Sequence, residues 1–310
     1  MELAIETKDL TKRYGSLVAV NKLNLKVEKE TIHGFLGPNG AGKTTTIKIL
    51  VGLLKPDSGK AIVLGNEVRG DNPKARLRVG YMPELPKFPK HLKGRELLDI
   101  YGRMYGMPTQ ERKAQIKRVI ELVGLKGREN DLIGEYSKGM QQRLGIAQAL
   151  LSEPELVILD EPSLGLDPVG MVEVREMVKE IAKEGVTVFL SSHLLLEVEQ
   201  ICSHISVIHK GICLASGPIR EVISKISGSS ILEIEVTELS DEVLEAVKGL
   251  PFISNLQVDG NKFLIEVNAN EDVRPLISQA ITKAGGIIIS MNMRMRSLEE
   301  AFIRLIMGTR

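Results

Sequence analysis

The segment Gly37–Thr44 contains residue types that could do chemistry. It reads Gly-Pro-Asn-Gly-Ala-Gly-Lys-Thr and fits the pattern G-x-x-x-x-G-K-[ST], a loop whose backbone N–H groups cradle phosphate oxygens. Glycines let the backbone approach the phosphates, because a Cβ there would block the contact. In this pattern Lys43 reaches the β- and γ-phosphates, and the Thr44 hydroxyl is a ligand of Mg²⁺. An ordinary glycine-rich turn would fit the composition too, so the flanking elements decide.

Those flanking elements favour a phosphate site. The apolar run Ile32–Leu36 predicts a buried strand, and Thr45–Val51 predicts a helix that stops at Gly52. The helix would direct its positive N-terminal end at the loop, which adds to the attraction for an anion. We therefore expect nucleotide binding, with contacts from the loop residues Asn39, Gly40, Gly42, Lys43, Thr44 and Thr45.

A second candidate site lies at the end of the apolar run Leu156–Glu161. A strand that ends in Asp160 and Glu161 can divide two tasks between neighbouring carboxylates. Asp160 suits the acid that holds Mg²⁺ in phosphate-loop enzymes. Glu161 would point differently and could accept a proton from an attacking water as general base. Standing alone, the two acids could equally be solvated groups at a strand end.

A third segment, Tyr136–Arg143, predicts a helix start with anion-binding character. Ser137 is a good N-cap residue, and Gly139 would allow another group to come close. Taken alone, these residues are explained by an ordinary helix cap. The segment supports an anion site only in combination with Gly37–Thr44 and Leu156–Glu161.

Composition sets the limits for these sites. The chain has 310 residues, which suggests two domains, and its 43% hydrophobic content is ample for packed cores. With 41 basic and 40 acidic residues, the net charge of +1 gives no global electrostatic reason to expect nucleic acid. Cys202 and Cys213 form no C-x-x-C pair, which favours a reduced compartment over a disulfide or a metal site. No apolar stretch approaches the ~20 residues needed to span a bilayer, and no signal-peptide pattern is present, so we expect a soluble chain.

The elements that must position these residues alternate between strands and helices. Short strands at 2–7 and 23–28 should flank a turn near Tyr14 and Gly15, and apolar runs over 60–64, 78–82, 156–160, 187–190 and 205–209 predict further strands. This alternation argues for an α/β fold with a mostly parallel sheet. Helical spacing over about 85–135 indicates a helical insert. A linker is expected over 219–230, and 231–310 predicts a β-α-β-β-α-β order with a final helix.

Residues 1–218 resemble the nucleotide-binding domain of an ABC transporter. Gly37–Thr44 corresponds to Walker A, Leu156–Glu161 to Walker B and Ser137–Gln142 to the signature segment. Ser163–Asp167 resembles the D-loop, Ser191–His193 resembles the switch-histidine loop, and Tyr14 falls at the position of the adenine-stacking aromatic.

This resemblance implies the fold, the ligands and the partners. The fold would be a P-loop ATPase with an antiparallel β edge and a helical insert, followed by a small α+β ferredoxin-like domain. ATP and Mg²⁺ would bind, with His193 on the γ-phosphate and Tyr14 on adenine. A second ABC ATPase subunit, most simply a second copy of this chain, would place its Ser137 and Gly139 on the γ-phosphate. The remaining histidines are expected to be structural or at the surface: His33, His91, His204 and His209.

Two positions depart from the family pattern. The signature usually begins Leu-Ser-Gly-Gly-Gln, whereas this chain has Lys138 for the first glycine and Met140 for the glutamine. After Tyr81-Met82-Pro83 the family commonly has a glutamine that senses Mg²⁺ and the membrane partner, and this chain has Glu84. A carboxylate can ligate Mg²⁺ but cannot donate a hydrogen bond when ionised. Glu84 is therefore expected near the metal, together with Thr44 and Asp160.

The sequence thus predicts an ATP-hydrolysing subunit of an ABC exporter at the cytoplasmic face of a membrane. Both departures and the small C-terminal domain resemble ATPase subunits of drug, antibiotic and ion exporters, whose membrane part is a separate polypeptide. One alternative is a soluble ABC-type ATPase that acts on nucleic acid or ribosomes, although no basic stripe or sustained heptad pattern is present. Another alternative is a module that senses ATP without hydrolysis, against which Glu161 argues.

Overall fold

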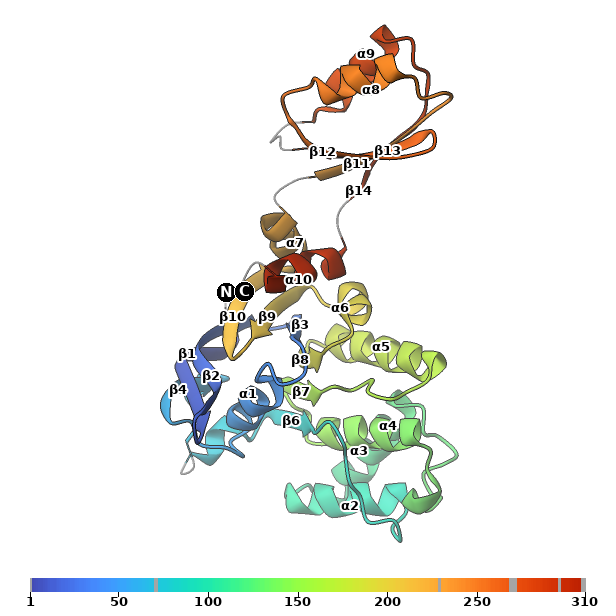
Figure 1. Ribbon diagram of the computed structural model, residues 1–310. Helices are drawn as coiled ribbons and strands as arrows, with labels where there is room; N and C mark the ends of the chain where they lie inside the picture. The colour runs from blue at the N-terminus through green and yellow to red at the C-terminus, as the bar shows by residue number, and fades with distance from the viewer. Residues whose placement is uncertain (1, 70–71, 228–229, 268–271, 295–296, 308–310) are drawn as a thin grey trace. The chain divides into compact units, whose positions relative to one another are not determined.

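The chain divides into two compact units, Met1–Ile219 and Arg220–Arg310 (Figure 1). The computed structural model describes residues 2–69, 72–227, 230–267, 272–294 and 297–307. The two units are described separately below.

One part of the first unit is an antiparallel sheet. It contains β1 (Leu3–Tyr14), β2 (Leu17–Glu28), β4 (Ser58–Val63) and β5 (Asn66–Glu67), in the order β2-β1-β4-β5. The β1–β2 turn lies where the sequence predicts it, at Gly15. Both strands are longer than predicted, because β-bulges interrupt the alternation of apolar and polar residues while the pairing continues to the turn.

The other sheet of this unit is mostly parallel, as predicted. It contains β3 (Ile32–Leu36), β6 (Val79–Met82), β7 (Leu156–Asp160), β8 (Thr187–Ser192), β9 (His204–His209) and β10 (Ile212–Pro218), in the order β10-β9-β3-β8-β7-β6. Only β10 runs antiparallel to its neighbour, after a tight turn at Lys210 and Gly211. Every residue of β7 and β8 is buried, as expected for a sheet that is covered on both faces.

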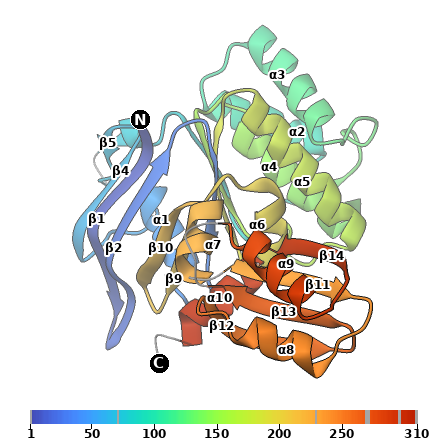
Figure 2. The same cartoon turned by 90° about the horizontal axis from the view of Figure 1, so that it is seen from above.

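Helices surround the parallel sheet. The α-helices of this unit are α1 (Lys43–Leu50), α2 (Gly94–Met104), α3 (Thr109–Leu122), α4 (Lys138–Leu150), α5 (Pro168–Lys183) and α6 (Leu195–Ile201), with short 3₁₀ turns η1 (Pro73–Ala75) and η2 (Ile133–Glu135). The predicted helical insert corresponds to α2, α3 and η2, which lie between β6 and β7 in the chain. Figure 2 shows α2 to α5 on one side of the first unit and the sheet of β1, β2 and β4 on the other.

The main core of the first unit surrounds α1. Ile47 and Leu50 of this helix are fully or almost fully buried, as is Phe35 of β3, in one cluster with apolar residues of both sheets. The rings of Phe35 and Phe189 are 5.3 Å apart at their centroids. Because α1 is packed on both sides, its N-terminus and the loop before it are held firmly against the ends of the strands.

The second unit has the predicted β-α-β-β-α-β order. Its elements are β11 (Ser230–Val236), α8 (Asp241–Lys248), β12 (Ile253–Asp259), β13 (Lys262–Val267), α9 (Arg274–Lys283) and β14 (Ile288–Arg294), followed by α10 (Leu298–Met307). The strand order is β12-β13-β11-β14, and all neighbours are antiparallel. The second unit has a hydrophobic core of its own, which includes Val247 of α8, Ile277 of α9 and Phe263 of β13. The split α+β arrangement is therefore a compact unit with a separate core.

The predicted linker over 219–230 needs correction. Residues Ile219–Ser227 form a helix, α7, in which Val222 and Ile223 are buried. Its apolar residues recur at the spacing of one helix face, from Ile219 through Val222 and Ile223 to Ile226. Pro218 before the helix and the Gly-Ser run after it had suggested a linker. The pair Gly228–Ser229 lies outside the described residues.

Other expectations concern cysteines and membranes. Cys202 and Cys213 are both free thiols, and burial raises the pKa of each. In the part of the chain that the structure describes, no helix combines the length and the apolar character that crossing a bilayer requires.

His33 is a buried polar residue in the parallel sheet. Its Nε2 lies 2.8 Å from the Ser206 hydroxyl, and Ser206 in turn is 2.7 Å from the Ser216 hydroxyl. Burial, followed by the charge of His204, lowers the pKa of His33 from 6.5 to about 3. The ring of His33 is therefore neutral in the folded protein at physiological pH. Among the described residues, the Ser206 hydroxyl is the only hydrogen-bond partner of this ring.

Stability of the first unit should therefore fall in mild acid. The unfolded chain takes up a proton on His33 near pH 6.5 while the folded chain does not, so stability is lost as pH falls below that value. Between about pH 7.5 and about pH 5.5 we expect this residue to cost about 1 kcal/mol. All tyrosines of the chain lie between Tyr14 and Tyr136, so tyrosine fluorescence during urea unfolding reports on this unit alone.

A His33→Gln variant keeps a polar group toward Ser206 and cannot titrate, so its pH dependence should be flatter than that of the wild type. His91 is exposed, and His91→Gln is the matched control, which should leave the wild-type slope in place. Equal slopes for the wild type and His33→Gln would contradict the prediction.

Candidate functional site

The loop between β3 and α1 is held by the backbone of two other strands. A Cβ at Gly37 would overlap the carbonyl oxygen of Ile208 in β9, and a Cβ at Gly42 would overlap that of Ala19 in β2. Gly42, with φ of +107°, is also the N-cap residue of α1, whose first turn contains no acidic side chain. Gly37 and Gly42 are therefore required by packing, whatever the loop binds. The helix N-terminus is left free to face an anion.

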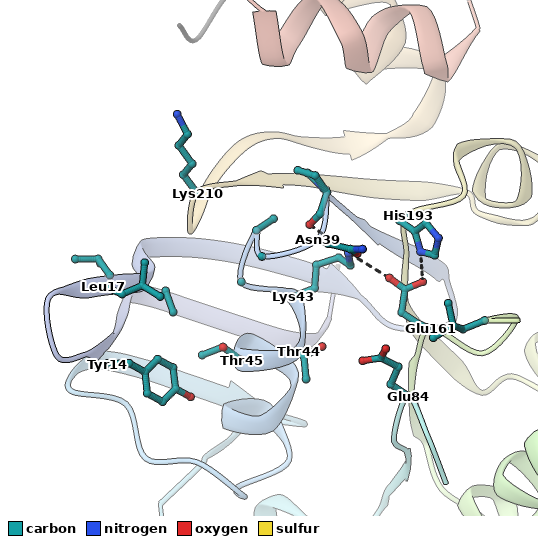
Figure 3. A pocket seen from close by; sticks show the side chains of 17 residues that line it. Tyr14, Leu17, Asn39, Lys43, Thr44, Thr45, Glu84, Glu161, His193 and Lys210 are labelled. Carbon is teal, nitrogen blue, oxygen red and sulfur yellow. Dashed lines mark hydrogen bonds and ion pairs between the residues drawn. The ribbon is translucent and has the colours of Figure 1, made fainter.

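A cavity of about 550 Å³ opens beside this loop (Figure 3). Most residues that the sequence singles out line it: Tyr14, Asn39, Gly40, Gly42, Lys43, Thr44, Thr45, Glu84, Glu161 and His193. Others were not anticipated, namely Leu17, Val18, Ala19, Leu164 and Lys210. The structure therefore brings the predicted nucleotide, base and sensor residues to one place.

Lys43 and His193 both bind the carboxylate of Glu161. The Lys43 ammonium lies 3.2 Å from Glu161 Oε1, and His193 Nδ1 lies 2.8 Å from Glu161 Oε2 (Figure 3). Lys43 also donates to the carbonyl of Gly37 at 2.7 Å. The side chains of Lys43 and Glu161 are only 7% and 8% exposed, so each charge depends on the other for compensation.

The backbone of Glu161 is strained. Its φ is +51°, a left-handed conformation that is uncommon for any residue other than glycine. The Glu161 N–H donates to the Ser191 hydroxyl at 2.9 Å, which helps to hold this conformation. Such strain is often found at functional sites, and here it turns the carboxylate toward Lys43.

Asp160 lies directly before Glu161 and faces a different group of atoms. The Ser191 hydroxyl donates to its Oδ1 at 2.6 Å, and the Thr44 hydroxyl is 3.5 Å from the same oxygen. Its other oxygen, Oδ2, is buried without a hydrogen-bond partner among the described residues. Burial raises the pKa of Asp160, against the hydrogen bonds from Ser191 and Thr44, and the charges of Glu84 and Glu161 raise it further.

This arrangement suits a divalent cation that arrives with phosphates. An unpaired buried carboxylate oxygen beside a hydroxyl has the hard oxygen donors that Mg²⁺ prefers, and Glu84 lines the same cavity. Within the described residues no cluster of three or more His, Cys, Asp or Glu side chains could hold a metal ion. Mg²⁺ is usually bound by one or two carboxylates together with substrate phosphates and water, and Asp160 beside Thr44 fits that use.

Ser137 and Gly139 do not line this cavity. Ser137 is the N-cap of α4 and accepts a hydrogen bond from the Met140 N–H at 3.2 Å. A Cβ at Gly139 would meet only Leu166 and Ser137, at ordinary contact distances of 3.7 and 3.9 Å. Among the described residues nothing gives Gly139 a packing reason to be glycine, and Ser137 is exposed.

Tyr14 lies at the outer end of the cavity, where it is 49% exposed. The ammonium of Lys12 lies 5.9 Å from its ring centroid and is fixed by Asp57 at 3.0 Å. A half-exposed ring beside a cavity is suited to stacking on a flat ligand group. The unpredicted neighbours Leu17 and Ala19 follow it on β2 and line the same end.

Similar proteins are known. The family described as ABC transporter matches residues 20–164. The bacitracin transport ATP-binding protein BcrA of Bacillus licheniformis is 39% identical over 311 residues, which cover 99% of each chain. The daunorubicin resistance ATP-binding protein DrrA3 of Streptomyces coeruleorubidus is 33% identical, with 98% of this chain and 96% of that protein covered. A solved structure of an ATP binding subunit of an ABC transporter is 30% identical with a TM-score of 0.66, and covers 72% of this chain and 93% of its own.

Gly40 and Gly42, two glycines of the phosphate loop, differ in how closely other atoms are packed around them. Gly40→Ala introduces a Cβ in open space, so it should cost only about 1 to 2 kcal/mol of left-handed backbone strain at φ of +78°. Gly42→Ala adds overlap with the Ala19 carbonyl, so it should destabilise the first unit by at least about 2 kcal/mol more. Urea unfolding followed by tyrosine fluorescence measures both variants. Equal losses would show that the contact with β2 does not constrain Gly42.

Proposed function

Because the chain belongs to the ABC transporter family of ATP-binding proteins, whose members are ATPases, we propose that it binds and hydrolyses MgATP in the cavity of its first unit. It powers an exporter whose membrane-spanning subunits are separate chains. The observation that carries this proposal is the convergence of Lys43, Glu161 and His193 on one cavity beside a phosphate-binding loop.

The cavity holds the parts of the nucleotide by their chemistry. Backbone N–H groups of residues 39–45 and the Lys43 ammonium receive the β- and γ-phosphates. Tyr14 stacks on adenine at the outer end of the cavity. Thr44, Asp160 and Glu84 would hold Mg²⁺, which would neutralise negative charge on the phosphates.

Hydrolysis needs a base for the attacking water, and Glu161 is placed for it. Its carboxylate accepts a proton from water as the water oxygen forms a bond to the γ-phosphorus and the bond to the ADP oxygen breaks. His193, at 2.8 Å from Glu161, orients this carboxylate and contacts the γ-phosphate. Lys43 leaves Glu161 when the phosphates arrive, because they present it with a stronger negative charge. Nucleotide binding therefore frees the base.

A second copy of the chain completes the site. Ser137 and Gly139 lie outside the cavity of their own chain, at a helix start that suits an anion. In a head-to-tail dimer they reach the γ-phosphate bound by the partner. ATP then joins two surfaces, and its hydrolysis separates them. The coupling between nucleotide and dimer is reciprocal, so whatever favours closure also tightens ATP binding.

The exporter assignment is supported by the similar proteins. BcrA is a bacitracin transport protein and DrrA3 is a daunorubicin resistance protein by name, and both match almost the whole of this chain. We assign the helical insert, about residues 85–135, to contact with the membrane subunits at the cytoplasmic face. Residues 231–310 form an accessory domain outside nucleotide binding. A soluble ATPase that acts on nucleic acid or ribosomes is the second possibility, and the net charge of +1 does not favour it.

The role of Glu161 can be tested by one isosteric change. Glu161→Gln keeps the size and hydrogen bonding of the side chain but cannot take up the proton. ATP hydrolysis should be at least ~100-fold slower, while ATP affinity is retained. Glu180→Gln, on the exposed side of α5, is the matched control and should leave the rate unchanged. If Glu161→Gln hydrolyses ATP at the wild-type rate, Glu161 is not the base. If the wild-type protein itself hydrolyses no ATP, the chain is a sensor.

The dimer can be tested in the same variant. Glu161→Gln should migrate as a dimer with ATP and as a monomer without it, because a ligand that binds only the closed form stabilises that form. Adding Ser137→Arg should abolish the dimer, since the larger side chain fills the space for the partner's γ-phosphate.

Ser240 caps α8 as Ser137 caps α4, by accepting a backbone N–H bond. Ser240→Arg therefore removes an equivalent cap in the second unit, which contributes no residue to the proposed shared site, and it should leave the ATP-dependent dimer intact. Size-exclusion chromatography with light scattering reads all three variants. An ATP-dependent dimer that persists in Ser137→Arg would refute the shared site.

A further inference from the structure

Lys138 has no role in the proposed mechanism, and Glu84 has one only as a Mg²⁺ ligand. Glu84 and Lys138 are the positions at which this sequence departs from the family pattern, and the departures have opposite charge. Glu84 adds a carboxylate where the family commonly has a neutral amide. Lys138 adds an ammonium where the family usually has glycine. The inference drawn from them rests on the proposed function, because it concerns the same shared nucleotide site.

Glu84 lines the nucleotide cavity, and no basic side chain among the described residues forms an ion pair with it. It lines the cavity together with Glu161 and Lys43. Its charge contributes to raising the pKa of Asp160, after burial and against the hydrogen bonds to that group. The described residues include no ion-pair partner for its side chain, while its backbone carbonyl accepts a hydrogen bond from Gln142 at 3.3 Å.

Charge within one chain does not compensate for a bound nucleotide. The cavity wall contains the carboxylates of Glu84 and Glu161 and the ammonium groups of Lys43 and Lys210, and Asp160 lies next to Thr44. These groups at best cancel one another, so the wall has no excess of positive side chains for a polyphosphate. The extra carboxylate at position 84 therefore has to be offset by the metal and by charge from outside the chain.

Lys138 lies at the other surface of the proposed interface. It is the first residue of α4, directly after Ser137, and its side chain is exposed. An ammonium at a helix N-terminus is unfavourable, because it adds to the positive end of the dipole. No acidic residue occupies the first turn, and no ion pair of Lys138 is present in the described part of the chain. This placement costs stability in the single chain.

The loop 163–167 leaves room for this ammonium. A Cβ at Gly165 would collide with Lys138 Nζ, so the side chain lies directly over that glycine. The backbone at Gly165 has φ of +69°, and Gly139 next to Lys138 lies against Leu166 of the same loop. Ser137, the Lys138 ammonium and the loop 163–167 thus lie together at one end of α4, beside the residues that meet the partner's γ-phosphate.

We propose that Lys138 is a cationic nucleotide ligand supplied in trans, which places its ammonium between the terminal phosphates and Glu84 of the partner subunit. It offsets the extra carboxylate and selects the closed dimer that contains ATP. The unfavourable position of Lys138 in the free chain is relieved only when an anion arrives. The two departures from the family pattern are therefore parts of one charge pair.

The first experiment removes the ammonium. In the Glu161→Gln background, Lys138→Met should raise the ATP concentration for half-maximal dimerisation at least ~10-fold, the change expected for losing one charge-assisted contact. ADP affinity of the monomer should stay the same, because that site lies within one chain. Lys113→Met removes an exposed charge from α3 in the helical insert and is the matched control, with no expected change.

The second experiment tests the pair itself. In a Glu84→Gln background, Lys138→Met should weaken ATP-dependent dimerisation at least ~3-fold less than it does when Glu84 is present, because the ammonium then has no carboxylate to offset. An equal effect of Lys138→Met in both backgrounds would overturn the pairing of these residues.

The third experiment displaces the ammonium without removing it. Gly165→Ala introduces the Cβ that collides with Lys138 Nζ, and it should weaken the ATP-dependent dimer in the presence of Lys138 and add little in the Lys138→Met background. Gly185→Ala is the control, since Gly185 has a similar φ of +83° and open space around its Cβ position.

Light scattering separates the outcomes. If Glu161→Gln dimerises with ATP and Lys138→Met behaves like Lys113→Met, the role of Lys138 is refuted and the proposed function stands. If Glu161→Gln itself remains monomeric with ATP, the shared site is refuted, and the inference falls with it.

Discussion

The buried ion pair between Lys43 and Glu161 is the interaction on which the rest of the site depends. Both side chains are almost fully enclosed, and a buried charge without a partner would cost several kcal/mol. The pair joins the helix after β3 to the end of β7, and His193 after β8 binds the same carboxylate. These three strands are neighbours in the order β3-β8-β7, with Leu36 opposite Ser192 and Asp160 opposite Ser191. The register of the parallel sheet therefore sets the distances within the site.

The proposed mechanism gives this interaction a further role. A carboxylate held by both Lys43 and His193 is not free to accept a proton, so the proposed base would have to be released first. A polyphosphate offers Lys43 more negative charge than one carboxylate does, and its binding would supply that release. Asp160 differs from Glu161, because its Oδ2 is buried without a hydrogen-bond partner among the described residues. Burial raises the pKa of Asp160 against the hydrogen bonds from Ser191 and Thr44, the charges of Glu84 and Glu161 raise it further, and a cation beside the carboxylate would offset these effects.

The sequence predicted the parts of the site that local patterns control. Gly37–Thr44 between an apolar strand and a helix, and the acids that end Leu156–Asp160, have signals that depend on neighbours in the chain. Ala19 and Lys210 were missed, because contacts between segments distant in the chain bring them to the cavity, whereas Leu17 pairs with Tyr14 across the β1–β2 turn and could have been found from Tyr14. The turn at Lys210 and Gly211 is fixed by backbone bonds to Ala41 and Asn21, a contact that periodicity cannot reveal. Helix α7 was missed for a different reason: the residues on either side of it are typical of linkers, and these outweighed its apolar spacing.

The open end of α4 supports the proposal that one chain makes half of a site. On the cavity side, Gly42 and Gly37 of the loop are required by the backbone of β2 and β9. On the other side, Gly139 has no neighbour that requires glycine, and Ser137 is exposed. In the proposed dimer, a glycine at this position would leave room for the partner's nucleotide. A nucleotide between two such surfaces would make closure depend on its phosphates, and removal of the γ-phosphate would take away the anion that both surfaces share.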